Sequence, residues 1–95
     1  MQSSHKRFLK SLGHPLSPVV RVGRGKITPQ VIEETRRSLD AHELIKVKLD
    51  LDDGEERRHL AGSLAEQTGA EIVGMVGKVA LMYRARDENP TIKLP

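Results

Sequence analysis

The amino-acid sequence predicts a single α/β domain over residues 1–95, built as a four-stranded mixed sheet packed on three helices. Segments with helical periodicity alternate with short β-branched runs, in the order helix, strand, helix, strand, helix, strand, strand. Strands joined through helices form parallel crossovers, and the last two strands add an antiparallel hairpin. A chain of 95 residues without a linker segment is the size of one small domain.

The first two predicted elements both end at a glycine. A helix is expected to begin with Ser3 or Ser4 as its cap and to stop at Gly13. Its apolar side is formed by Phe8, Leu9 and Leu12. The β-branched run "VVRV" at residues 19–22 then predicts a short strand, which Gly23 ends.

The second helix and second strand have the clearest local signals in the chain. Thr28 followed by Pro29 predicts an N-cap and first helical residue, and the helix is expected to run to about His42. Its buried residues are expected to be Ile32, Thr35 and Leu39. The segment "LIKVKLDL" at residues 44–51 alternates apolar and polar side chains, which predicts a strand with one buried face.

The remaining elements are a third helix and a hairpin. Asp53 is expected to cap the helix, with a glutamate three residues later, and Gly69 fits a left-handed stop after it. The runs "AEIVGMV" and "VALMYR" are separated by Gly77 and Lys78, which predicts a two-residue turn between antiparallel strands. Residues 86–95 are polar and bounded by proline, so we expect a loosely attached tail.

Charge is unevenly distributed along the chain. Residues 1–32 contain six basic and no acidic residues, whereas residues 33–76 contain six basic and eleven acidic residues. The formal net charge is +3. A positive N-terminal third favours a polyanionic partner, and the alternative is a solvated surface that is basic without binding anything.

Composition excludes several classes of protein. No apolar run approaches the roughly 20 residues needed to span a bilayer, and the basic N-terminus lacks the apolar core of a signal peptide, so we expect a cytoplasmic protein without a membrane partner. Cysteine is absent, the histidines are scattered, and the acidic run "DLDDGEE" lacks the spacing of a calcium loop. We therefore expect no enzyme, no metal site, no cofactor and no small-molecule substrate.

The segment "VGRGKIT" at residues 22–28 places glycines and positive charge at the start of a helix. It matches neither the Walker loop nor the dinucleotide fingerprint, because glycines are missing at required positions. It does contain what a phosphate site needs: free N–H groups near Thr28, the small Gly23 and Gly25, and the charges of Arg24 and Lys26. The same glycines also fit a tight turn without a ligand, and the spacing leaves both interpretations open.

Five segments in a specific order carry a resemblance to a known family. They are "FLKSLGHPLSPVVRVG", "IT" at a helix start, "HELIKVKL", "TGAEIV" and "GKVALMYR". In order and spacing they resemble the bacterial YhbY-like proteins, each of which is a single CRM domain, an RNA-binding module.

The resemblance implies a fold similar to the C-terminal domain of translation initiation factor three. It also implies association with precursors of the large ribosomal subunit through structured ribosomal RNA. The family's G-x-x-G loop, likened to the RNA-clamping loop of KH domains, falls on residues 23–26. Lys26 occupies the second glycine position and a glycine stands at 25 instead, so we expect an electropositive phosphate contact there.

The combined hypothesis is a monomeric RNA-binding protein that assists maturation of the large ribosomal subunit through contacts with the phosphate backbone. The predicted RNA-binding residues are Lys6, Arg7, Lys10, His14, Arg21, Gly23, Arg24, Gly25, Lys26, Thr28, Arg84 and Arg86. Phosphate contacts position RNA without reading its sequence, and with two aromatic residues the chain is not expected to stack bases in the manner of an RRM. The alternative is a protein-docking module on the ribosome with incidental RNA contact.

Overall fold

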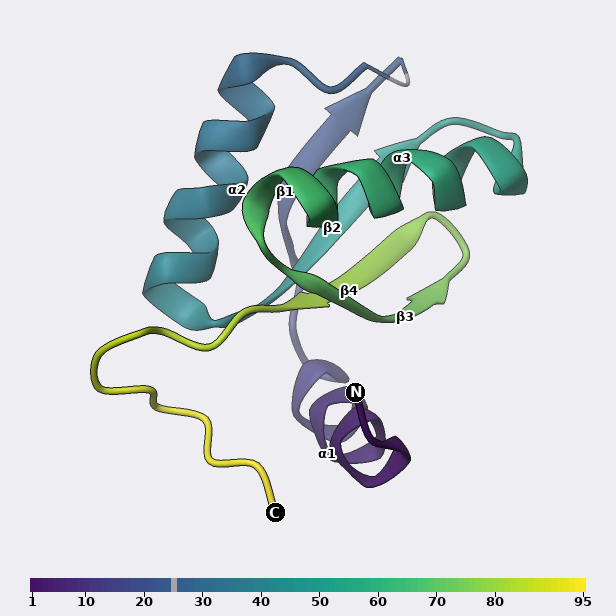
Figure 1. The fold of residues 1–95 in the computed structure, drawn as a ribbon. Helices are drawn as coiled ribbons and strands as arrows, with labels where there is room; N and C mark the ends of the chain where they lie inside the picture. The colour runs from purple at the N-terminus through teal and green to yellow at the C-terminus, as the bar shows by residue number, and fades with distance from the viewer. Residues whose placement is uncertain (25) are drawn as a thin grey trace.

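The computed structural model describes residues 1–24 and 26–95, and within these ranges the chain forms three helices and four strands (Figure 1). In chain order they are α1 (Ser3–Gly13), β1 (Pro18–Gly23), α2 (Pro29–His42), β2 (Leu44–Asp50), α3 (Gly54–Thr68), β3 (Glu71–Val76) and β4 (Val79–Tyr83). The predicted order of elements and the α/β fold class are confirmed.

The sheet is mixed, with the strand order β1-β2-β4-β3. β1 pairs with β2 in parallel, whereas β4 pairs antiparallel with both β2 and β3. The hairpin strand β4 thus inserts between β2 and β3, and the two outer strands are β1 and β3. This order determines which side chains lie next to each other on each face of the sheet.

α2 and α3 pack on one face of the sheet and enclose the main hydrophobic core (Figure 1). The alternation in β2 places Ile45, Val47 and Leu49 on this face, all essentially without accessible surface. The core also includes Val20, Val22, Leu39, Ala61, Leu64, Ala65, Ala80 and Met82. In the described part of the chain, no helix is long and apolar enough to cross a membrane.

The two core helices begin and end as the sequence predicts. Thr28 is the N-cap of α2, and its Oγ1 accepts a hydrogen bond from the N–H of Val31 at 3.2 Å. Asp53 caps α3 and accepts from the N–H groups of Glu55 and Glu56 at 2.8 and 3.2 Å. Gly69 ends α3 with φ of 72°, a left-handed conformation that glycine adopts without steric cost.

α1 packs on the opposite face of the sheet, and its details differ from the prediction. Gln2 is its N-cap and makes no side-chain cap bond, in place of the expected serine, whereas the helix ends at Gly13 as predicted. Leu9 is fully buried, but Leu12 is 41% exposed. Gly13 also allows close packing, because a Cβ there would lie 2.7 Å from Cδ1 of Leu81.

The segment predicted to be a loose tail is held to the domain by one buried carboxylate, which corrects that expectation. Glu43 follows α2, has no accessible surface, and accepts hydrogen bonds from the N–H groups of Arg86, Thr91 and Ile92 at 2.7 to 2.9 Å. The Thr91 hydroxyl donates a fourth bond at 2.7 Å. The side chains of Ile92 and Leu94 also pack against a second, smaller core beneath α1, formed by Leu9, Leu44, Val73, Leu81 and Tyr83.

These hydrogen bonds determine the charge state of Glu43. Burial alone raises the pKa of a carboxyl group, but the bonds from the Thr91 hydroxyl and from the three amides outweigh it and lower the pKa of Glu43 from 4.5 to about 2. Glu43 is therefore ionised at neutral pH. Local sequence patterns give no indication of these contacts, because all the donors lie at least 43 residues away along the chain.

Candidate nucleic-acid interface

α1 covers only one end of its sheet face, and the rest of that face is open. The strand register places its side chains in two rows across all four strands. The row nearer α1 consists of Pro18, Lys46, Leu81 and Gly74, and the next row consists of Arg21, Lys48, Val79 and Val76. Basic side chains therefore occupy the β1 and β2 half of the open face, and apolar side chains occupy the β4 and β3 half.

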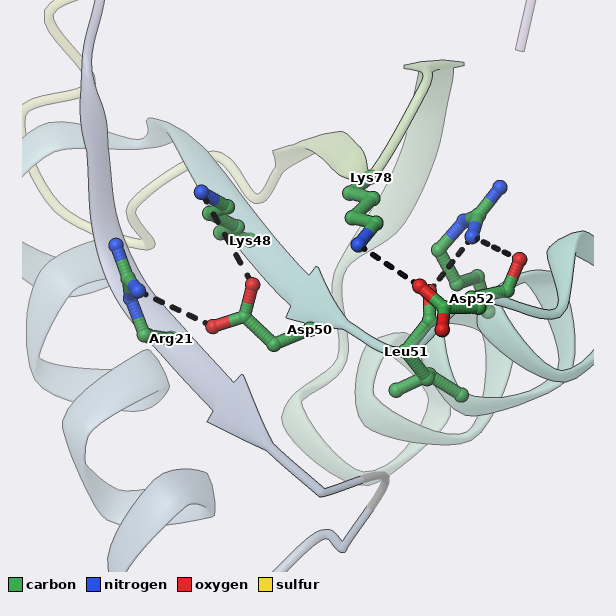
Figure 2. A network of polar contacts seen from close by, with 7 residues as sticks. Arg21, Lys48, Asp50, Leu51, Asp52 and Lys78 are labelled. Atoms are coloured by element: carbon green, nitrogen blue, oxygen red, sulfur yellow. Dashed lines mark hydrogen bonds and ion pairs between the residues drawn. The ribbon is translucent and has the colours of Figure 1, made fainter.

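In the row farther from α1, one carboxylate partly neutralises the cations (Figure 2). Asp50 lies between Arg21 and Lys48, with N–O distances of 3.1 and 3.9 Å. Nearby, Lys78 in the hairpin turn pairs with Asp52 at 3.2 Å. Asp50 serves two cations, so this cluster retains a net positive charge. Exposed pairs of this kind contribute little to stability, roughly 0–1 kcal/mol each.

The row nearer α1 connects the open face to that helix. The stem of Lys10 lies against β3, where its Cε is 2.9 Å from the position that a Cβ on Gly74 would take. Across the row, Nζ of Lys46 donates to the backbone carbonyl of His14 at 3.2 Å, at the C-terminal end of α1. Four basic residues, Lys6, Arg7, Lys10 and Lys46, form no ion pair with any described residue.

The predicted loop lies at the other end of β1 from α1 (Figure 1). The six residues of β1 separate the two by roughly 20 Å, at about 3.3 Å per residue. The residues predicted as one patch are therefore two ends of a longer surface, joined by the open sheet face. We call this surface the basic band: Lys6, Arg7, Lys10, His14, Arg21, Lys46 and Lys48, ending at Lys26, all at least partly exposed.

The loop has a turn but an uneven charge environment. The N–H of Lys26 donates to the carbonyl of Gly23 at 3.3 Å, and Arg24 has φ of 54°. Arg24 lines a hollow of about 620 Å³ together with the acidic start of α3, where Asp53, Glu55 and Glu56 lie. These carboxylates reduce the attraction of Arg24 for a phosphate. Gly25, also predicted as a contact, lies outside the described residues.

The start of α2 offers fewer donors than the sequence suggests. Pro29 has no N–H group, and the N–H groups of Val31 and Ile32 donate to the side chain and carbonyl of Thr28 at 3.2 and 3.1 Å. Among the first four helical residues, that leaves the N–H of Gln30 without an intrahelical acceptor. Thr28 thus acts first as a cap, and a phosphate at this site would depend mainly on Lys26.

Arg84 and Arg86 are not brought together with the basic band. The Arg84 guanidinium donates to the Thr68 carbonyl at 2.8 Å and forms an ion pair with Asp40. Arg86 follows it into the C-terminal segment, where its guanidinium donates to the Thr91 hydroxyl at 3.2 Å. These contacts tie Arg84 to α2 and α3, whereas the Arg86 contact lies within the C-terminal segment.

Lys46 and Lys48 are members of the basic band that the sequence prediction did not include. The signal that could have identified them is the alternation in "LIKVKLDL", which places both lysines opposite the buried face of β2. Whether that opposite face is covered by a helix cannot be read from alternation. The strand order and the position of α1 leave it open.

Comparison with known proteins identifies the family of this chain. The family model of the CRS1/YhbY (CRM) domain matches residues 1–84. A Pseudomonas aeruginosa protein named as a probable RNA-binding protein is 42% identical over 84 residues, covering 88% of this chain and 81% of its own length. The probable RNA-binding protein YqeI of Bacillus subtilis is 32% identical, covering 100% of this chain and 99% of its own.

Two further relatives extend over nearly the whole chain. An RNA-binding protein of Haemophilus influenzae is 36% identical and covers 100% of this chain and 95% of its own. The solution structure of a hypothetical protein from Staphylococcus aureus matches this fold with a TM-score of 0.88. The sequences are 34% identical, and the match covers 100% of this chain and 99% of that one. The chain belongs to the CRS1/YhbY (CRM) domain family, and the matched residues 1–84 contain all the helices and strands that the structure describes.

Proposed function

We propose that this protein binds structured RNA through the basic band, and that its target is ribosomal RNA in precursors of the large ribosomal subunit, whose maturation it assists. The observation that carries RNA binding is the open sheet face beside α1, where Lys6, Arg7, Lys10 and Lys46 have no carboxylate partner among the described residues. The names of the relatives as RNA-binding proteins support it. The ribosomal target is supported by the family resemblance.

The physical basis of binding is the neutralisation of phosphates. Each lysine or arginine that contacts a phosphate releases condensed counterions, so affinity falls as salt rises. About six contacts predict a loss of roughly a thousandfold in affinity between about 50 and 200 mM salt. Filter binding of an RNA hairpin across that range measures the slope, and a flat response would refute the phosphate-contact mechanism.

A pair of matched variants tests the position of the interface. Lys6→Glu with Lys10→Glu reverses two charges on the exposed side of α1, whereas Arg37→Glu with Arg58→Glu reverses two exposed charges on the helices that cover the other face. Both variants change the net charge equally, so a difference between them reports location rather than total charge. We expect the α1 variant to bind RNA at least tenfold more weakly than the control variant. Equal losses would contradict the proposed surface.

The loop is tested at Gly23, which the fold does not require to be glycine. A Cβ built on Gly23 meets no described atom within 4 Å, and its φ lies outside the left-handed region. Gly23→Ala should therefore leave the melting temperature unchanged, but it should weaken RNA binding if the RNA backbone approaches this point. Arg24→Glu with Lys26→Glu tests the charges of the same loop. Normal RNA binding by both variants would show that the loop is a turn without RNA contact.

The ribosomal target is tested by sedimentation of the tagged protein from a cell lysate through a sucrose gradient. We expect comigration with the large subunit or its precursors at low salt, and loss of comigration as salt rises or after RNase treatment. Comigration that survives RNase digestion would favour the alternative, docking on a ribosomal protein. Protein that stays at the top of the gradient at low salt, yet binds RNA hairpins, would refute the ribosomal target alone.

A further inference from the structure

A groove lies between α1 and the open sheet face, with a volume of about 550 Å³. Its lining comes from α1, the segment after it and all four strands, and none of the described lining residues is acidic. We propose that this groove receives one unpaired nucleobase of a structured RNA, while the lysines at its rim hold the neighbouring phosphates. The proposal rests on the RNA-binding function proposed above and specifies the class of RNA.

Two glycines shape the groove where α1 crosses the sheet. Gly13 allows α1 to approach β4 so closely that a Cβ would collide with two methyl groups of Leu81, at 2.7 and 2.9 Å. Gly74 leaves the surface of β3 without a side chain, so the stem of Lys10 lies along the strand. The groove continues over the apolar side chains Leu16, Val76, Val79 and Leu81.

Basic and apolar side chains meet at the boundary between β2 and β4, at the groove and beside it. Lys46 on β2 is directly paired with Leu81 on β4, and Lys48 is paired with Val79. Adjacent strands are about 4.8 Å apart, so each ammonium-bearing side chain has an apolar neighbour. A nucleotide combines the complementary groups, because its anionic phosphate is joined to a base whose ring faces are apolar. Enzymes that take up extruded bases hold them between aromatic or apolar side chains in this way.

The size of the groove favours a base over a stable protein partner. A volume of 550 Å³ lies within the roughly 300–1,000 Å³ of pockets that hold one small ligand. A stable protein partner needs about 800 Å² of buried surface on each side, which a groove of this size does not supply by itself. The cationic rim complements a phosphate backbone, and the relatives are named RNA-binding proteins.

The test compares two RNA hairpins that differ only in one unpaired adenosine in the stem. Wild-type protein should bind the bulged hairpin about five- to tenfold more tightly than the fully paired one, because the groove removes part of the apolar ring surface of the base from water. Val79→Glu places a carboxylate in the groove and should remove the preference. Val76→Glu does the same at a residue that is 84% exposed, so folding is not at risk.

The control is Leu12→Glu, which adds the same charge to α1 at a residue that is 41% exposed and does not line the groove. It should weaken binding of both hairpins equally and keep their ratio. Equal binding of the two hairpins by wild-type protein, or a preference that survives both groove variants, would overturn the groove proposal and leave RNA binding intact. Failure to bind either hairpin would instead overturn the proposed function.

Discussion

Glu43 provides the sharpest prediction about the fold, because its carboxylate accepts four of the hydrogen bonds that hold the C-terminal segment. Glu43→Ala removes the acceptor of four hydrogen bonds, three of them from backbone amides. The backbone at this residue has φ of 64°, and alanine, which also has a Cβ, tolerates it no better or worse than glutamate. The variant therefore isolates the effect of the carboxylate. We expect residues 86–95 to detach and the domain to lose stability.

The magnitude follows from the pKa. Lowering the pKa of Glu43 from 4.5 to about 2 corresponds to at most roughly 3 kcal/mol of stability at neutral pH, at 1.36 kcal/mol per unit. All four donors come from one extended segment, which can detach and bond to water instead, so we expect a loss of about 2 kcal/mol. For a domain of this size that loss lowers Tm by roughly 10 °C.

The assay is thermal unfolding followed by circular dichroism, with Glu33→Ala as the control because Glu33 is exposed on α2, the helix that Glu43 follows. The folded-state pKa is depressed, so the stabilisation is fully present above pH 4.5 and disappears as pH falls toward about 2. The Tm difference between wild type and Glu43→Ala should shrink across that window. A Tm equal to that of the control at pH 7, with unchanged amide protection in residues 86–95, would refute the reasoning.

Two further substitutions test the open face and the helix that borders it. Asp50→Asn should tighten RNA binding severalfold, because it frees Arg21 and Lys48 from their shared carboxylate. Filter binding at low salt measures this change. Weaker binding would place the RNA elsewhere. Gly13→Ala should destabilise the domain by about 1–3 kcal/mol, because its Cβ would overlap the methyl groups of Leu81. Urea unfolding measures that loss, and unchanged stability would show that α1 can shift away from the sheet.

Local chemistry by itself determined most of the elements of this fold. The pair Thr28–Pro29 defines the start of α2, and Gly69 defines the end of α3, because caps and left-handed stops depend only on neighbouring residues. The alternation in β2 likewise determines which of its side chains are buried. The same local patterns identified the basic residues of α1 as exposed, which the structure confirms.

The tertiary structure alone decided how these elements share a surface. Insertion of β4 between β2 and β3 places Val79 and Leu81 beside the lysines of β2, and no local pattern encodes that strand order. The tertiary structure also separates α1 from the loop at residues 23–26 by the length of β1. It gives Arg84 structural partners near α2 and α3. The carboxylate of Glu43 finds donors at least 43 residues away. Pairings between residues distant in the chain depend on which packing arrangement buries the most apolar surface, and that is a property of the whole chain rather than of any segment.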